Sequence, residues 1–246
     1  MKIALVFQAD KKFLPGLKCL IKSLELFNGL SKFDKILISD DLNEFQDFKI
    51  KKVNYEIYKD IDYSKLGKKK ERFKKTFYKL ECFNLEKYDR VVFLDADILC
   101  MGDIDLLFSE TLNAKHFWAA KDKGIKDALL YKDNHIRVNT GVMIINKSLL
   151  NKDTFLKLID IAKKKLSYDG SDQGVINEYI FQEKVDIGHL PTEYNALKRI
   201  YVHDRALYEN IKDDIKLLHF VGKKPWEEND KDYEGLENIW WRVNNK

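Results

Sequence analysis

The stretch Arg90-Val91-Val92-Phe93-Leu94-Asp95-Ala96-Asp97 decides the fold of this 246-residue chain. Its apolar part, residues 91–94, has no polar interruption and is typical of a strand that is buried on both faces. Two carboxylates follow that strand directly. In open sheets with parallel strands, ligands bind beyond the carboxyl ends of the strands, so we expect the functional site at this point.

Outward from this strand, apolar runs alternate with segments of helical period. The segment 14–27 places apolar side chains three and four positions apart, which makes one face of a helix. We expect strands over 3–7, 35–39, 53–58, 117–120, 142–145 and 217–220 and helices over 14–27 and 76–85. This alternation predicts an α/β fold with a mainly parallel, twisted, Rossmann-like sheet flanked by helices. Because the sequence has no repeat and no linker-like stretch, we expect a single domain over 1–246.

The composition excludes several classes of protein. An apolar content of 45% with 11 glycines and 3 prolines is unlike a disordered or low-complexity chain. The 44 basic and 40 acidic residues leave a net charge of only +4, which indicates no specific nucleic-acid binding. The three cysteines form no CxxC pair, which argues against a disulfide framework or a zinc ribbon and favours a reducing setting.

The hydrophobic pattern predicts a cytoplasmic protein. No stretch approaches the ~20 apolar residues that a membrane-spanning helix needs. The apolar run at 3–7 is short and lacks a small-residue cleavage site, so we interpret it as a buried strand rather than a signal peptide. A peripheral contact with a membrane surface and a homodimer stay open.

The carboxylates of Asp95 and Asp97 are candidates for binding a metal ion. Two residues apart at a strand end, they project to the same side of the chain, where each disfavours ionisation of the other. A divalent cation removes that cost, and oxygen-rich sites suit Mg²⁺ and Mn²⁺. A surface turn would produce the same Asp-x-Asp pattern, but the preceding apolar strand favours the metal site.

Further blocks accompany this one along the chain. In order, the blocks are Phe7-Gln8-Ala9-Asp10, 77–85 followed by 88–97, Asn139-Thr140-Gly141-Val142, 169–174 and 219–226. Together they resemble the family 8 glycosyltransferases, the glycogenin-like retaining enzymes, from about residue 3 to residue 226. The resemblance implies a GT-A fold, a UDP-sugar donor and usually Mn²⁺, with Mg²⁺ as the alternative. It places the nucleotide-binding half at about 1–100, the sugar- and acceptor-binding half at about 101–226 and a tail at 227–246.

The same resemblance implies the metal ligands. Asp95 and Asp97, with Ala96 between them in the donor site, match the two metal-binding aspartates, and His219 matches the third protein ligand. On its own, His219 would be read as an ordinary core or surface histidine. Lys79 resembles a basic residue that contacts phosphate or ribose, and the alternative is an exposed lysine on an amphipathic helix.

At the end of the first expected strand, Phe7, Ala9 and Asp10 match positions that hold uracil and ribose. Phe13 falls where the family often has a tyrosine facing the base. This change removes a hydroxyl group but keeps a stacking surface. The alternative is that Phe13 only caps the core.

The turn after His219 resembles the diphosphate-binding turn of the family. Gly222 would let the backbone approach the phosphates, and Lys223 or Lys224 would supply positive charge. Between Gly222 and Pro225 this chain has two residues, where glycogenin-type members have three. We favour Lys224 as the contacting lysine.

The donor sugar is expected to meet Asn139, Asp169, Asp172 and Gln173, whose amides and carboxylates suit the hydroxyl groups of a hexose. Asp169 and Asp172 are one helical turn apart and can face the same pocket. The alternative is that Asp and Ser residues of this block cap a helix, and both interpretations can hold together.

The resemblance thus implies a retaining, metal-dependent hexosyltransferase that uses a UDP-sugar, with glucose favoured and galactose next. The acceptor would be a glycan, a lipid-linked glycan or a protein. Lys79 and Lys224 would stabilise charge as the donor bond breaks. Asp172 and Gln173 lie nearest the reacting face and would position the substrate, while nucleophilic participation stays a hypothesis.

Other interpretations remain. The chain could bind nucleotide sugars without turnover, or glycosylate itself, for instance at Tyr201 or Tyr208. The segment 65–75 holds seven basic residues out of eleven and would attract a phosphorylated ligand or an anionic acceptor, or form a solvated loop. Trp240-Trp241-Arg242 would contact a membrane surface or a partner, or pack back on the core.

Overall fold

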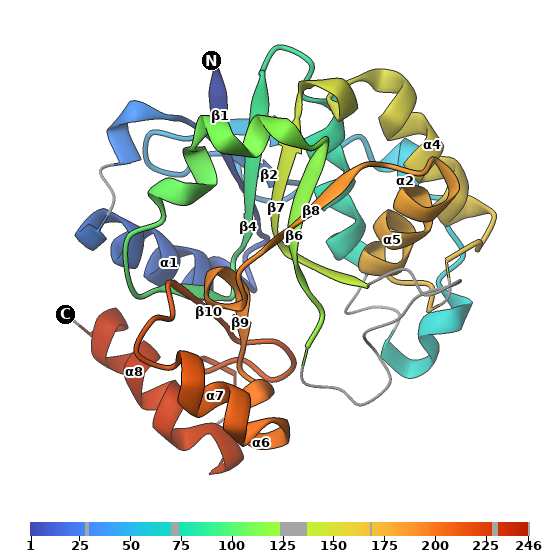
Figure 1. The fold of residues 1–246 in the computed structure, drawn as a ribbon. Coiled ribbons are helices and arrows are strands. Elements are labelled where there is room, and N and C mark those ends of the chain that lie inside the picture. Colours follow the sequence, from blue (N-terminus) through green and yellow to red (C-terminus); the bar gives the residue numbers. More distant parts are fainter. Residues whose placement is uncertain (28–29, 70–73, 124–136, 168, 228–230, 246) are drawn as a thin grey trace.

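A computed structural model describes residues 1–27, 30–69, 74–123, 137–167, 169–227 and 231–245 of the chain. The main strands are β1 (Ile3–Gln8), β2 (Asp34–Ser39), β3 (Lys49–Lys52), β4 (Arg90–Asp95), β6 (Phe117–Lys121), β7 (Val138–Asn146) and β8 (Ile187–Leu190). They form one seven-stranded sheet in the order β3-β2-β1-β4-β7-β6-β8 (Figure 1). Only β7 runs antiparallel to its neighbours, so the sheet is mainly parallel as expected.

Helices cover both faces of this sheet. The α-helices are α1 (Leu14–Phe27), α2 (Tyr55–Tyr58), α4 (Lys152–Lys163), α5 (Asp172–Gln182), α6 (Ile200–His203), α7 (Arg205–Ile211) and α8 (Glu234–Asn244). The 3-10 helices are η1 (Leu30–Lys32), η2 (Ser64–Lys69), η3 (Lys74–Asn84), η4 (Asp105–Phe108), η5 (Glu110–Ala114), η7 (Lys147–Leu149), η8 (Thr192–Asn195) and η9 (Lys231–Tyr233). In Figure 1, α1 lies on one side of the sheet, and α4 and α5 lie on the other.

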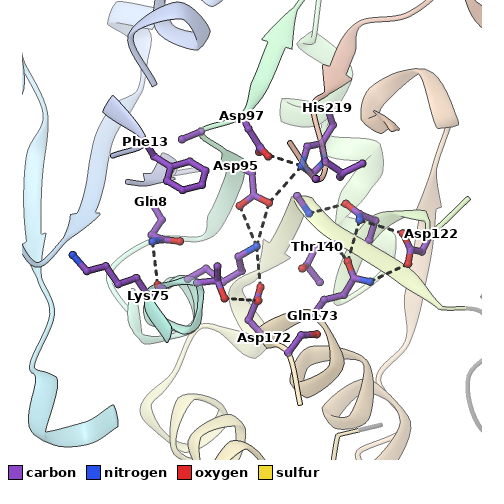
Figure 2. A pocket seen from close by; sticks show the side chains of 18 of the residues that line it. Gln8, Phe13, Lys75, Asp95, Asp97, Asp122, Thr140, Asp172, Gln173 and His219 are labelled. Carbon is purple, nitrogen blue, oxygen red and sulfur yellow. Dashed lines mark hydrogen bonds and ion pairs between the residues drawn. The ribbon is translucent and has the colours of Figure 1, made fainter. Parts of the chain in front are cut away.

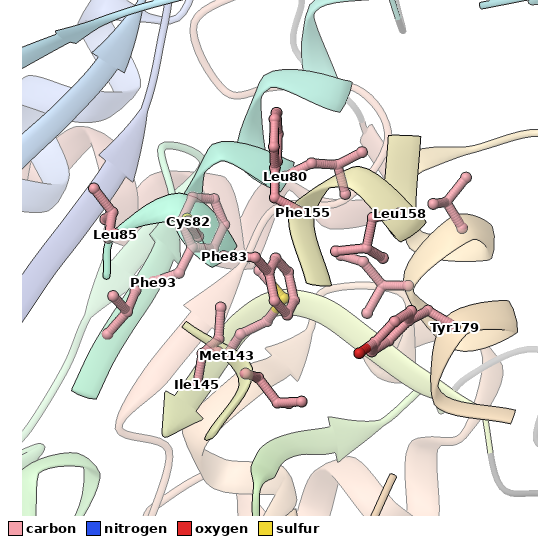
Figure 3. Packing of buried hydrophobic residues seen from close by; sticks show 14 of the residues in the cluster. Leu80, Cys82, Phe83, Leu85, Phe93, Met143, Ile145, Phe155, Leu158 and Tyr179 are labelled. Carbon is pink, nitrogen blue, oxygen red and sulfur yellow. The ribbon is translucent and has the colours of Figure 1, made fainter. Parts of the chain in front are cut away.

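Strand β4 lies at the centre of the sheet and contributes side chains to both layers of the core. Its side chains alternate, so Phe93 packs with η3, α4 and α5, and Leu94 packs with α1 on the opposite face. Figure 3 shows the first of these clusters, in which Phe93 lies near Phe83 and Met143. A strand buried on both faces explains the uninterrupted apolar run that identified it.

A second, small sheet brings a late segment of the chain close to the end of β4. It consists of β5 (Ile98–Cys100), β10 (Leu217–His219) and β9 (Ala196–Leu197) in the order β5-β10-β9. Because β10 pairs antiparallel with β5, His219 lies opposite Ile98, the residue that follows Asp97. The backbone N–H of Phe220 also donates to the carbonyl of Asp97 at 2.9 Å.

Most expected elements are confirmed, and one is wrong. The alternation at 53–58 predicted a strand there. The strand, β3, instead ends at Lys52, and residues 55–58 form the helix α2. The Oδ1 of Asn54 accepts a hydrogen bond from the N–H of Glu56 and caps that helix. The expected helix at 76–85 is the 3-10 helix η3, and the short strands β5, β8 and β9 were not expected.

The C-terminal helix α8 packs against α1. Trp240 is buried in a cluster with Cys19 and Leu236, whereas its neighbour Trp241 is exposed. The packing interpretation therefore holds for Trp240. None of the helices in the described ranges is long and apolar enough to cross a membrane.

Candidate active site

A cavity of about 870 Å³ opens beyond the carboxyl ends of β1 and β4 (Figure 2). Of the site residues predicted from the sequence, it is lined by Asp10, Phe13, Lys79, Asp95, Ala96, Asp97, Asn139, Asp169, Asp172, Gln173, His219, Gly222 and Lys224. Phe7, Ala9 and Lys223 are the predicted residues that do not line it. The structure therefore gathers residues from the whole length of the chain at one edge of the sheet.

Asp95, Asp97 and His219 form a cluster that fits a divalent cation. One ligand atom from each lies within 4.8 Å of the others. The Nε2 of His219 is 3.1 Å from Oδ1 of Asp97 and 3.8 Å from Oδ2 of Asp95. Two carboxylates and one imidazole suit Mn²⁺ or Mg²⁺ and leave further positions for ligand oxygens.

Lys79 is buried between two carboxylates rather than exposed on a helix, so the amphipathic alternative is wrong. Its Nζ lies 3.0 Å from Oδ1 of Asp95 and 3.1 Å from Oδ2 of Asp172. Burial alone would lower the pKa of Lys79, but the two carboxylates outweigh it and hold that pKa above its ordinary value. The lysine is therefore a fixed positive charge beside the metal ligands.

Lys224 lines the cavity and Lys223 does not, and a contact of Lys224 with a diphosphate stays a prediction. The Nζ of Lys224 contacts Oδ2 of Asp97 and donates to the carbonyl of Phe220 at 3.0 Å. Burial alone would raise the pKa of Asp97, but Lys224 and His219 outweigh it and hold that pKa well below its ordinary value. The turn depends on Gly222, whose φ of 84° is in the left-handed region.

The end of β1 matches the expectation only in part. Phe7 is buried against Phe48, with ring centroids 5.5 Å apart, and Ala9 is also buried. Asp10 lines the cavity as expected, and so does Gln8, which was not among the predicted residues. Phe13 fits both of its interpretations, because it lines the cavity and also packs edge-on against Trp226 and the core.

The N-terminus of α5 supplies the other wall. Ser171 is its N-cap, and its Oγ accepts from the N–H of Gly174 at 2.9 Å. Asp169 supports that cap by accepting from both the N–H and the Oγ of Ser171. Asp172, the first residue of α5, turns toward Lys79 and accepts from Oγ1 of Thr76 at 2.6 Å. The capping and cavity interpretations therefore hold together for this block.

Gln173 is held by a network of hydrogen bonds. Its Oε1 accepts from Nδ2 of Asn139 at 3.0 Å and from the N–H of Thr140 at 3.3 Å. Its Nε2 donates to Oδ2 of the buried Asp122 at 3.0 Å. These contacts fix which end of the Gln173 amide carries the oxygen.

Sequence reasoning missed several residues of the site. Asp122 directly follows β6, as Asp95 ends β4, so the rule that placed Asp95 at a strand end could have found it. Arg137 stands two positions before Asn139, and both line the cavity. Arg199 follows the two-residue strand β9, which no hydrophobic period reveals.

The sequence matches the family model Glycosyl transferase family 8 over residues 4–230. The chain belongs to glycosyltransferase family 8. It is similar to glycogenin-1 of Caenorhabditis elegans, with 34% identity over 154 residues that cover 61% of this chain and 32% of that protein. A putative UDP-glucuronate:xylan alpha-glucuronosyltransferase 5 of Arabidopsis thaliana is 29% identical over 202 residues, covering 74% of this chain and 31% of that protein. The chain thus spans about a third of the length of these relatives.

The fold has a solved counterpart. The structure of the galactosyltransferase LgtC with donor and acceptor sugar analogues superposes with a TM-score of 0.73, covering 98% of this chain and 95% of that chain. The identity is 18%, so the likeness concerns the fold. The expectation of a GT-A fold in a family 8 glycosyltransferase is confirmed.

Proposed function

We propose that this family 8 chain is a retaining, metal-dependent hexosyltransferase that takes its sugar from a UDP-hexose, with glucose favoured and galactose next. The observation that carries the proposal is the position of Asp95, Asp97 and His219 in one cavity with Lys224 and the amide network of Gln173. The acceptor is a glycan, a lipid-linked glycan or a protein.

In this proposal, Asp95, Asp97 and His219 hold Mn²⁺ or Mg²⁺ against the donor diphosphate. The bound ion supplies Lewis-acid chemistry by neutralising negative charge on the leaving UDP. Lys224 adds positive charge from the turn after β10, and Lys79 does so from the floor of the cavity. Phe13 and Asp10 face the nucleoside.

The sugar then occupies the space between Asn139, Asp172 and Gln173. Asp172 is paired with Lys79, so its negative charge is balanced and it orients donor hydroxyl groups. Gln173 presents an amide that Asn139 and Asp122 hold in one orientation. Both residues act here by positioning, and nucleophilic attack by Asp172 is the competing hypothesis.

The first experiment is UDP release from UDP-glucose, UDP-galactose and UDP-glucuronate, each with Mn²⁺, with Mg²⁺ and with EDTA. We expect release from one donor, dependent on the metal ion and abolished in Asp97→Ala. Asp213→Ala, an exposed aspartate outside the cavity, is the matched control and should keep wild-type release. UDP binding without release, with or without added acceptor, would instead favour a nucleotide-sugar binding protein.

Self-glycosylation is the second candidate among transferase functions. Tyr201 and Tyr208 form an edge-on pair, with ring centroids 4.9 Å apart, and the Arg205 guanidinium lies over both rings. Neither tyrosine lines the cavity, so modification would have to occur between molecules. Mass spectrometry after incubation with the donor tests this, and Tyr201→Phe and Tyr208→Phe locate the site.

A further inference from the structure

One end of the cavity contains a buried carboxylate that is saturated with donors. Asp122 is only 1% exposed. Its Oδ1 accepts from Arg199 and from Nδ2 of Asn139 at 3.2 Å. Its Oδ2 contacts Nε of Arg137 at 3.1 Å and Nε2 of Gln173 at 3.0 Å. Both oxygens of the Asp122 carboxylate therefore already have protein partners. Two of these partners are guanidinium groups, which Asp122 holds in place.

Both guanidinium groups line the cavity wall. Arg199 is fixed a second time, because its Nε donates to the carbonyl of Lys123 at 2.7 Å. Arg137 is fixed by Asp169, whose Oδ2 lies 3.5 Å from Nη2. A guanidinium has five N–H donors in a rigid plane, and the named contacts use two of those of Arg199. Arg199 is one of the residues that line the cavity.

The charge at this end is positive. Among the described residues that line it, Arg137, Arg199 and Lys65 are cationic, and Asp122 and Asp169 are anionic. Lys65 is held by backbone carbonyls, at 2.6 and 2.7 Å, rather than by a carboxylate. The hydroxyl groups of a neutral hexose need hydrogen bonds but not a surplus of fixed cations.

We propose that Arg137 and Arg199 form a subsite for the carboxylate of an acidic sugar. The planar guanidinium of arginine binds a carboxylate through two parallel N–H···O hydrogen bonds. Because Asp122 already holds the two arginine side chains in place, less conformational entropy is lost when a ligand binds. The inference rests on the proposed metal-dependent transfer from a UDP-sugar, and it adds that one of the two sugars in the reaction is a uronic acid. If that sugar is the donor, UDP-glucuronate takes the place of the UDP-glucose favoured above. The carboxylate comes either from the donor or from the acceptor.

Calorimetry separates these sources. Binding of UDP, UDP-glucose and UDP-glucuronate is measured with Mn²⁺, and binding of methyl glucoside and methyl glucuronide is then measured to the protein saturated with UDP. We expect one glucuronic acid compound to bind roughly tenfold or more tightly than its glucose counterpart, because charge-assisted hydrogen bonds form. Preference among the nucleotide sugars identifies the donor, and preference among the glycosides identifies the acceptor.

Substitutions at Arg199 locate the subsite. Arg199→Gln should remove the preference for the acid and leave the affinity for UDP unchanged. Arg199→Lys keeps the charge beside Asp122 and the fold, and it should lose part of the preference because lysine lacks the planar fork. Arg205→Gln, an arginine on α7 outside the cavity, is the matched control and should retain the whole preference.

The proposal is overturned if neither glucuronic acid compound is preferred, or if the preference survives in both Arg199 variants. In either case normal UDP affinity would leave the proposed function intact. Absence of UDP binding to the wild-type protein would count against the proposed function and the subsite together.

Discussion

The Oδ1 of Asn195 lies 2.9 Å from Nδ1 of His219, in a contact buried between η8 and β10. The orientation of the Asn195 amide is determined by its other end, because its Nδ2 donates at 2.8 Å to Oδ1 of Asn139. That oxygen also accepts from the N–H of Gly141. In the neutral imidazole, Nδ1 therefore carries the proton, and Nε2 is the atom that faces Asp97 and is available to the proposed metal ion.

Replacing Asn195 by alanine should weaken metal binding. Without its acceptor, the His219 ring loses a defined tautomer and orientation, which at such positions typically costs about 10–100-fold in metal affinity. Titration of Mn²⁺, followed by electron paramagnetic resonance, measures the change without any need for activity. Asn238→Ala, an exposed asparagine on α8, is the control. Equal Mn²⁺ affinity in Asn195→Ala and wild type would show that the contact does not orient the ligand.

Gly141 should not tolerate even one added methyl group. A Cβ at this position would lie 2.2 Å from Cε1 of His219, so the imidazole would have to leave its place among the proposed metal ligands. We expect Gly141→Ala to lower Mn²⁺ affinity severely and to reduce the free energy of unfolding by about 1–3 kcal/mol.

The matched control for Gly141→Ala is Gly235→Ala in α8. A Cβ there would meet only the Tyr201 hydroxyl, at 3.5 Å, which is an ordinary contact. Alanine also favours a helix over glycine by up to about 1 kcal/mol, so this variant should bind metal normally and unfold no more easily. Thermal denaturation and Mn²⁺ titration of both variants test the contrast, and normal metal binding by Gly141→Ala would contradict it.

The parts of the site that the sequence predicted depend on local pattern. The apolar run before Asp95 indicated a buried strand, and the spacing to Asp97 indicated a shared direction for the two carboxylates. The place of His219 depends on the pairing of β10 with β5 across more than one hundred residues, which no local pattern reveals. Only the family resemblance connected these residues before the structure did.

The errors also have local causes. Val53, Tyr55 and Ile57 alternate as in a strand, but Asn54 caps a short helix, and a cap outweighs a weak alternation. The true strand, β3, is an edge strand rich in lysine, and exposed edges are often charged in this way. Arg199 could not be placed because β9 has only two residues and because the partners of the Arg199 side chain, Lys123 and Asp122, are 76 and 77 residues away in the sequence.

Lys223 and Lys224 provide an adjacent pair of lysines in different environments. Lys224 is buried in the cavity wall against Asp97, whereas Lys223 is exposed and lies outside the wall. We expect Lys224→Ala to weaken UDP binding in the presence of Mn²⁺ by roughly 10–100-fold, since a charge-assisted bond is worth about 1.5–3 kcal/mol. Calorimetry should show near wild-type affinity for Lys223→Ala, because the carbonyl that Lys198 contacts is retained. Equal losses in the two variants would refute this assignment.

Asp172→Asn distinguishes positioning from nucleophilic attack. The carboxylate of Asp172 is paired with Lys79 and accepts from Thr76, so asparagine keeps the shape of the contact and one acceptor oxygen but loses the charge. If Asp172 positions the sugar, a slight displacement of its side chain should lower kcat by about 10²-fold. Loss of a nucleophile should cost about 10⁴-fold or more.

Turnover of Asp172→Asn, measured as UDP release at saturating donor, is therefore expected to fall by about 10²-fold, with UDP affinity unchanged. Thr76→Val is the companion variant, because it removes the 2.6 Å hydrogen bond to Asp172 and leaves the carboxylate in place. A positioning role predicts losses of similar size in the two variants. A nucleophilic role predicts that Asp172→Asn is almost inactive while Thr76→Val stays active, and a covalent sugar adduct on Asp172, seen by mass spectrometry of the trapped wild-type protein, would decide for it.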